Sequence, residues 1–198
     1  MTGNAITGVI LAGGRSSRMG QDKGLVEIDG LPLFVHIANK LLPQVGTLLI
    51  SSNQHQEQYA DRFAVIGDIT ADFAGPLAGM LAALVACQTE WVAIVPCDVP
   101  AFPDNLVQRL WENKGQAPAA YVTDGERAHP TLCLLNKSLI PHLREYLAQG
   151  ERKVMLFFAQ IAAQQVVFAN PAAFANLNTP EDVQRWQASL TTTQRSHY

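Results

Sequence analysis

The sequence predicts an α/β fold, with helices on both faces of a mainly parallel, twisted sheet and an antiparallel strand at one edge. Short apolar runs alternate with amphipathic segments along the chain, the order typical of parallel strands joined by crossover helices. The run 91–95 (WVAIV) is apolar at every position, as expected of a strand buried on both faces. In the second half, the apolar runs 119–123 and 130–135 follow each other without a helix between them, which favours an antiparallel strand there.

The first expected strand, residues 6–11, leads into a glycine-rich loop. Between residues 13 and 24 this loop mixes glycines and serines with Arg15, Arg18 and Lys23. Glycines let backbone N–H groups point inward together, which attracts anions, and long cationic side chains suit phosphate oxygens. The loop has neither the Gly-Lys-Ser/Thr sequence of a P-loop nor the G-x-G-x-x-G spacing of dinucleotide-binding proteins. We therefore predict that it wraps the phosphates of a nucleotide; the alternative is a surface loop with solvated charges.

Apolar periodicity and turn residues define the remaining elements. Pro32 begins a helix directly after the Asp29-Gly30 turn. The sequence TPED, from residue 179, has the capping threonine, first-turn proline and acidic pair of a helix start. Strands are expected at 6–11, 25–28, 47–52, 64–66, 91–95, 119–123, 130–135 and 165–168. Helices are expected at 32–42, 77–87, 103–114, 137–149, 154–163 and 180–190, with 54–62 as helix or loop. The folded domain is therefore expected to span 1–190, followed by a disordered polar tail at 191–198.

Composition excludes several classes of protein. The 198 residues favour one domain, and 48% hydrophobic with 16% charged residues rules out a disordered chain. A net charge of −3 argues against a nucleic-acid-binding protein, and no apolar stretch approaches the roughly 20 residues of a membrane span. The apolar start lacks the basic leader of a signal peptide. Cys87, Cys97 and Cys133 lack zinc-site spacing, so we expect buried, reduced thiols in a cytoplasmic protein.

Candidate site residues follow predicted strands, at the edge where ligands bind in open α/β sheets. They are the glycine loop after Leu11, Asp68 after the strand 64–66 and Asp98 after the strand 91–95. Mg²⁺ is typically held by one or two carboxylates together with substrate phosphates, so Asp98 is the candidate metal ligand. The alternative is that Asp98, in the sequence Asp-x-Pro, only caps a turn. A cationic loop together with a metal-binding carboxylate predicts transfer to or from a nucleoside triphosphate.

The histidines give no catalytic constellation. Only His129 lies in a loop between two expected strands, and structural or solvent roles are expected for the others. No Ser/His/Asp order stands out and G-x-S-x-G is absent, which weakens a hydrolase interpretation.

The motifs LAGGRSSRMGQDKG, GPLAGM, PCDVP, DGERAHPT, GERKVM and NLNTPED together resemble those of the molybdenum cofactor guanylyltransferases, over nearly the whole chain. The first motif fits a larger set of sugar-phosphate and cofactor nucleotidyltransferases, whereas the combination is more specific. The resemblance implies a single Rossmann-like nucleotidyltransferase domain with a Mg²⁺ cofactor. It implies transfer of GMP from GTP to the terminal phosphate of molybdopterin, giving molybdopterin guanine dinucleotide and pyrophosphate. It also implies molybdenum-insertion proteins and molybdoenzyme chaperones as partners.

The resemblance further implies roles for individual residues. The catalytic residues would be Asp98, Lys23 and Arg18, with Asp98 also binding the metal. GTP would contact Leu11, Ala12, Gly13, Lys23, Ser51, Asp68 and Asp98. The molybdopterin side of the site would include Gly79, Arg127, His129, Asn176 and Asn178. Ser51 departs from the pattern, because some relatives carry an asparagine there and serine lacks the amide donor.

Two other functions stay open on the sequence alone. One is a cytidylyltransferase of the same fold that acts on molybdopterin or a sugar alcohol phosphate. The other is a non-catalytic GTP-binding module that delivers cofactor, which predicts binding without pyrophosphate release. For a transferase, the acceptor phosphate is already a nucleophile, so positioning and electrostatics would do nearly all the work.

Overall fold

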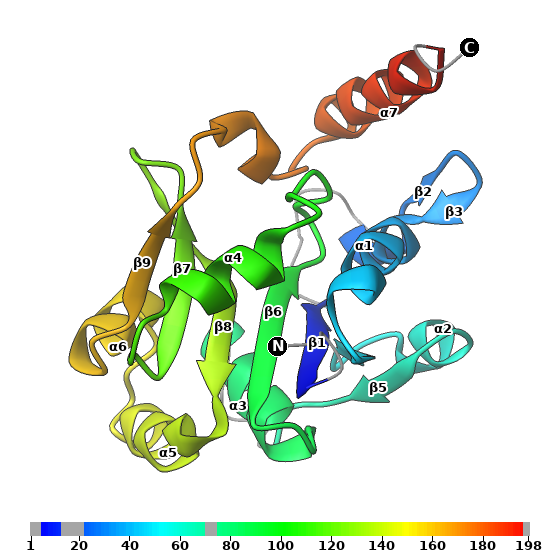
Figure 1. Cartoon of the computed structure of the whole chain (residues 1–198). Helices are drawn as coiled ribbons and strands as arrows, with labels where there is room; N and C mark the ends of the chain where they lie inside the picture. Colours follow the sequence, from blue (N-terminus) through cyan, green and yellow to red (C-terminus); the bar gives the residue numbers. More distant parts are fainter. Residues whose placement is uncertain (1–4, 13–21, 70–74, 196–198) are drawn as a thin grey trace.

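The computed structural model describes residues 5–12, 22–69 and 75–195, which form a seven-stranded mixed sheet with helices on both faces (Figure 1). Neighbouring strands are parallel except at β8, which is antiparallel to both β6 and β7. Across the sheet the strands are β5 (Ala64–Ile66), β4 (Thr47–Ser51), β1 (Ile6–Leu11), β6 (Trp91–Pro96), β8 (Ala128–Asn136), β7 (Ala119–Thr123) and β9 (Gln164–Val167). The predicted fold class is confirmed.

The antiparallel strand lies inside the sheet rather than at the predicted edge. β7 and β8 form a hairpin, and β8 pairs with β6 on its other side. β8 is therefore enclosed between β6 and β7. The chain then crosses back through two helices and adds β9 in parallel to the free side of β7. Because β9 covers β7, the edge strands are β5 and β9.

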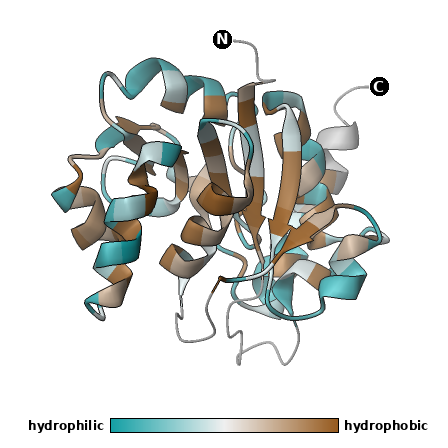
Figure 2. Ribbon diagram, turned by 90° about the horizontal axis from the view of Figure 1, so that it is seen from below, coloured by the Kyte–Doolittle hydropathy of each residue, from teal (hydrophilic) through white to brown (hydrophobic). Residues whose placement is uncertain are grey.

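Alternate side chains of the central strands face opposite layers of helices. Val9 and Val92 pack with α3, α5 and α6, whereas Ile10 and Ala93 pack with α1 and α4. This alternation follows the two-residue period of a strand and explains why the central runs are apolar throughout. Figure 2 shows hydrophobic residues along the central strands and hydrophilic residues toward the outside. The helices are α1 (Leu33–Leu41), α2 (Gln56–Ala60), α3 (Pro76–Ala86), α4 (Leu106–Asn113), α5 (Ile140–Ala148), α6 (Val154–Gln160) and α7 (Pro180–Arg195).

The last helix extends further than the sequence predicted. α7 ends at Arg195 rather than near Leu190, and Trp186 and Leu190 pack against the core. The Trp186 ring meets His36 of α1 edge-on, with 5.4 Å between ring centroids. Gln187 donates a 2.7 Å hydrogen bond to Asp29. Asp29 belongs to the turn of the small hairpin β2 (Glu27–Ile28) and β3 (Leu31–Pro32), so α7 is joined to the N-terminal half of the chain.

The structure also describes the cysteines and the apolar helices. The three cysteines are buried and free, as predicted. Over the described ranges, no helix combines the length and apolar character needed to cross a bilayer.

Candidate active site

The carboxyl ends of β1, β4 and β6 lie next to one another. They form the end of the sheet that is called its carboxyl edge below. Leu11, the last residue of β1, pairs with Ser51 of β4 and with the last residue of β6. The sheet bonding continues past the strands: Ala12 N–H donates to the Ser51 carbonyl at 2.8 Å, and Cys97 N–H donates to the Leu11 carbonyl at 3.0 Å. These bonds fix the backbone between the end of β6 and Asp98.

Lys23, Asp98 and Asn178 meet at this edge, although they are far apart in the sequence. Nζ of Lys23 lies 3.5 Å from Oδ2 of Asp98 and donates a 2.8 Å hydrogen bond to Oδ1 of Asn178. The Lys23 and Asp98 side chains are 19% and 21% exposed, so both are largely shielded yet open to a ligand. A cation, a carboxylate and an amide at one sheet edge form a polar cluster suited to binding a charged substrate.

Asn178 is held by the start of α7 and by the end of β6. Oδ2 of Asp182 accepts hydrogen bonds at 3.0 Å from the N–H groups of Asn178 and Thr179, and Thr179 Oγ1 accepts from Asp182 N–H at 3.2 Å. These backbone N–H donors, that of Asn178 first, lower the pKa of Asp182 below its ordinary value. The neighbouring Leu177 N–H donates to the Asp98 carbonyl at 2.8 Å. The predicted helix cap therefore also positions a site residue.

Asp68 lies at the same edge, after β5, and is fixed by Asn53 after β4. The Asn53 side chain donates to Oδ2 of Asp68 and accepts from Asp68 N–H, both at 2.7 Å. Asn53 is not among the residues that the sequence predicted for the site. The sequence signal for Asn53 was the polar ending of the expected strand 47–52, ISSN at residues 50–53. The pairing of Asn53 with Asp68 depends on β4 and β5 being neighbours, which local pattern does not reveal.

Ser51 and Gly79 lie together beneath the end of β1. Ser51 is 4% exposed. A Cβ on Gly79 would lie 2.9 Å from Leu11 Cδ2 and 3.3 Å from Ser51 Oγ, so glycine lets α3 approach the strand ends closely. Gly79, predicted on the molybdopterin side, thus packs beside two residues predicted on the GTP side.

His129 lies at the β7–β8 hairpin and forms a pair with Asp124. Nε2 of His129 is 2.8 Å from Oδ2 of Asp124, and the imidazole stacks on Phe174 with 5.2 Å between ring centroids. Oδ1 of Asp124 accepts from the N–H groups of Glu126 and Arg127 at 2.9 and 2.7 Å. The His129 hydrogen bond, followed by these backbone donors, lowers the pKa of Asp124 to about 2. A permanently ionised Asp124 therefore orients the His129 ring at neutral pH.

Arg127 and Asn176, also predicted on the molybdopterin side, are close in the chain to His129 and to Phe174, respectively. Arg127, at the hairpin tip, is exposed, and so is Asn176. Phe174, under the His129 ring, ends the 3-10 helix η5 (Pro171–Phe174) that precedes Asn176. Gly13 and Arg18 lie outside the described residues.

The donor set at Asp98 fits a metal that is shared with a substrate. Over the described part of the chain, no three His, Cys, Asp or Glu side chains gather closely enough to hold a metal ion by themselves. Asp98 offers one partly exposed carboxylate, and Mg²⁺ commonly takes one or two carboxylates with the remaining positions filled by phosphate oxygens and water. The residues present therefore fit a magnesium ion that arrives with a nucleotide.

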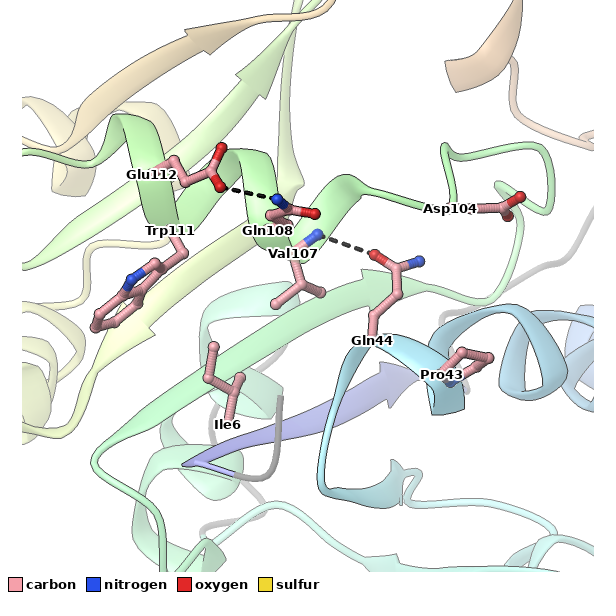
Figure 3. Close-up of a pocket in the computed structure, with 8 residues that line it drawn as sticks. All are labelled: Ile6, Pro43, Gln44, Asp104, Val107, Gln108, Trp111 and Glu112. Carbon is pink, nitrogen blue, oxygen red and sulfur yellow. Dashed lines mark hydrogen bonds between the residues drawn. The ribbon is translucent and has the colours of Figure 1, made fainter. Parts of the chain in front are cut away.

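A separate pocket of about 410 Å³ lies between α4 and the segment that holds Pro43 and Gln44, beside the start of β1 (Figure 3). Ile6, the first residue of β1, lines it together with η3 (Leu42–Gln44) and residues of α4. Gln44 joins its two sides, since Oε1 accepts from Val107 N–H at 3.0 Å and Nε2 donates to the Lys40 and Pro103 carbonyls. None of the pocket's lining residues is a predicted site residue.

Comparison with known proteins gives both a family and a shared fold. The family model described as the MobA-like NTP transferase domain matches residues 8–166. Molybdenum cofactor guanylyltransferases from Serratia proteamaculans and Yersinia pseudotuberculosis are 56% and 54% identical over 185 residues. These alignments cover 92% of this chain and 94% and 95% of the relatives. The solved structure of molybdopterin-guanine dinucleotide biosynthesis protein A from Archaeoglobus fulgidus superposes with a TM-score of 0.76 at 21% identity, covering 94% of this chain and 99% of that one.

Proposed function

The chain belongs to the MobA-like NTP transferase family, and from that premise we propose that it transfers GMP from GTP to the terminal phosphate of molybdopterin, releasing pyrophosphate. Its family and its relatives make it a nucleotidyltransferase, a guanylyltransferase of molybdenum cofactor biosynthesis. The observation that supports the specific reaction is the meeting of Lys23, Asp98 and Asn178 at the carboxyl edge of the sheet.

GTP would bind along the ends of β1, β4, β5 and β6. Leu11, Ala12 and Ser51 border this edge, and Asp68 is held rigidly by Asn53, ready to accept a hydrogen bond from a ribose or base. Lys23 would contact the phosphates, because its ammonium is the cation that the described residues bring to Asp98. Gly13 and Arg18, as residues of the glycine loop, would complete the predicted phosphate site.

Asp98 would hold Mg²⁺ together with phosphate oxygens. When bound, the cation would neutralise negative charge that builds on the phosphates during transfer. Lys23 would add a second positive charge beside Asp98, and Asn178 orients it through the 2.8 Å hydrogen bond. No side chain is required as a base, because the acceptor phosphate is ionised and nucleophilic. The site works by bringing two anions together and stabilising the charge between them.

Molybdopterin would approach from the side of the β7–β8 hairpin. Segment 174–178 runs from the ring under His129 to the amide that contacts Lys23, so it connects the two parts of the site. Asn176 and the exposed Arg127 are available there for a phosphate or a pterin amide. Gly79 would contribute by letting α3 pack closely against Leu11 and Ser51. Delivery of the product through molybdenum-insertion proteins and molybdoenzyme chaperones in the cytoplasm remains a prediction.

Pyrophosphate release tests the proposal directly. The purified protein is incubated with GTP, CTP or ATP, with and without molybdopterin, in Mg²⁺ and in chelator. We expect release that needs GTP, molybdopterin and Mg²⁺ together. A preference for CTP would make the protein a cytidylyltransferase, and GTP binding without release would make it a non-catalytic module.

A further inference from the structure

Tyr59, a fully buried residue of α2, contacts the turn that carries Lys23. Its side chain is 0% exposed, and its ring packs edge-on against Phe34 with 4.8 Å between centroids. Its hydroxyl donates a 2.8 Å hydrogen bond to Oδ1 of Asp22. Burial, reinforced by the Asp22 carboxylate, raises the pKa of Tyr59 above its ordinary value, so the hydroxyl stays protonated and acts as a donor.

Asp22 joins Tyr59 to the backbone next to Lys23. The same Oδ1 atom accepts a 3.1 Å hydrogen bond from Gly24 N–H, which makes Asp22 the N-cap of the 3-10 helix η2 (Lys23–Leu25). The second oxygen, Oδ2, is buried and has no hydrogen-bond partner among the described residues. A carboxylate with one buried oxygen and no described donor to it depends strongly on the donors to its other oxygen, so the Tyr59 hydroxyl matters to this turn.

Gly24 places the turn directly against Tyr59. A Cβ on Gly24 would collide with the Tyr59 hydroxyl, so only glycine permits this approach. Lys23 lies between the two residues that Tyr59 contacts, and its side chain leaves this fixed turn toward Asp98 and Asn178. The direction of the Lys23 side chain is therefore set by contacts that lie below the site.

We propose that Tyr59 and Asp22 are positioning residues for Lys23, an inference that rests on the proposed transfer reaction. The hydroxyl of Tyr59 and the carboxylate of Asp22 fix η2, and η2 fixes where the ammonium of Lys23 lies relative to Asp98. Neither residue needs to touch the substrate. The effect on the reaction follows because a displacement of about 1 Å in a reacting group can cost on the order of a hundredfold in rate.

The first test removes one oxygen atom. Tyr59→Phe keeps the ring against Phe34 and deletes the hydrogen bond to Asp22. Tyr146→Phe is the matched control, because Tyr146 is 3% exposed and its hydroxyl donates a 2.9 Å hydrogen bond to the Lys153 carbonyl. Tyr146 packs in the part of the core on the other face of the sheet, with α3, α5 and α6. We expect both variants to lose Tm, but only Tyr59→Phe to lower kcat/KM for GTP, by about tenfold. Equal kcat/KM in the two variants would overturn the proposal.

A double-mutant cycle shows whether the effect passes through Lys23. In a Lys23→Ala background, Tyr59→Phe should change kcat/KM by less than about twofold, because the group it positions is already gone. The Tm effect of Tyr59→Phe should persist in both backgrounds. The same tenfold loss in the presence and absence of Lys23 would mean that Tyr59 acts otherwise, and would contradict the proposal.

Amide hydrogen exchange separates this inference from the proposed function. Tyr59→Phe should speed exchange at Gly24 N–H by at least about tenfold, whereas Tyr146→Phe should leave it unchanged. If the parent protein shows no GMP transfer, the proposed function fails but the exchange measurement still decides whether Tyr59 holds the turn. Unchanged exchange at Gly24 would rule out the contact as a positioning device.

Discussion

The two halves of the sheet supply site residues in different ways. In the first half, β1, β4, β5 and β6 are parallel, and their carboxyl ends bring Leu11, Ser51, Asp68 and Asp98 to one edge. In the second half, β8 is antiparallel, so a hairpin tip reaches that edge and His129 lies at the beginning of a strand. In the proposed reaction the parallel half would bind the nucleotide, whereas the hairpin and segment 174–178 would bind the acceptor.

The largest effect is expected from Asp98, at the centre of the parallel half. Asp98→Ala should lower kcat by at least about a hundredfold, since it removes the carboxylate proposed to hold Mg²⁺. Asp104→Ala is the control, because the Asp104 side chain is 89% exposed and pairs only with Lys40 at 3.6 Å among the described residues. Steady-state kinetics at saturating Mg²⁺ measure both. Near-normal turnover of Asp98→Ala would remove this residue from the site.

Lys23 should give the next largest effect. Lys23→Ala should lower kcat/KM for GTP by about tenfold to a hundredfold, because it removes a charge-assisted contact to the phosphates. The fold should persist, since the Lys23 side chain lies at the sheet edge rather than in the core. The Tm and the kinetics of Lys23→Ala are compared with those of Lys40→Ala. Parent-like kinetics would show that the glycine-loop assignment is wrong at Lys23.

A substitution in the β7–β8 hairpin should affect the other substrate, molybdopterin. His129→Ala should raise KM for molybdopterin by about tenfold, the loss expected from one oriented polar contact, while KM for GTP stays within about twofold. His142→Ala, at an exposed position of α5, serves as the control. If His129→Ala changed KM for GTP instead, the division between the two halves would be incorrect.

The smallest effect concerns acid stability of the hairpin. The pKa of Asp124 is lowered from 3.8 to about 2, so its ionised form stabilises the folded state above pH 3.8. This contribution is lost as the pH falls through the interval between these two values. The free energy of unfolding of Asp124→Asn should therefore decline less steeply than that of the parent as the pH falls below about 4. Urea unfolding at several pH values measures the slopes, with Asp104→Asn as the control, and identical slopes would contradict the hydrogen-bonded pair.

Local pattern predicted the elements and the residues that depend on strand ends. The continuous apolar run of β6 identified a buried strand, and its exit identified Asp98, because a carboxylate there has no role in the core. The same pattern could not place β8, since its interior position depends on pairing with β6, from Ile94–Cys133 to Trp91–Asn136, across 39 to 45 positions of the chain. It could not extend α7 to Arg195 either, because residues 191–195 (TTTQR) contain no apolar residue and so show no helical periodicity.

Contacts between distant segments explain the residues that the sequence did not reveal. Asn53 meets Asp68 only because β4 and β5 are neighbours, and Tyr59 meets Asp22 across 37 positions of the chain. From local sequence alone, Asn53 and Tyr59 cannot be distinguished from ordinary loop and core residues. Residues that act by orienting others are thus harder to predict than residues that face the ligand.

A crystal structure with GTP and Mg²⁺ bound would test the central claim most directly. We expect a metal ion about 2.1 Å from an Asp98 oxygen, the usual Mg²⁺ distance, with phosphate oxygens as further ligands and Lys23 beside the triphosphate. A nucleotide bound instead in the pocket beside Gln44 and α4, or an Asp98 carboxylate turned away from every phosphate, would contradict it.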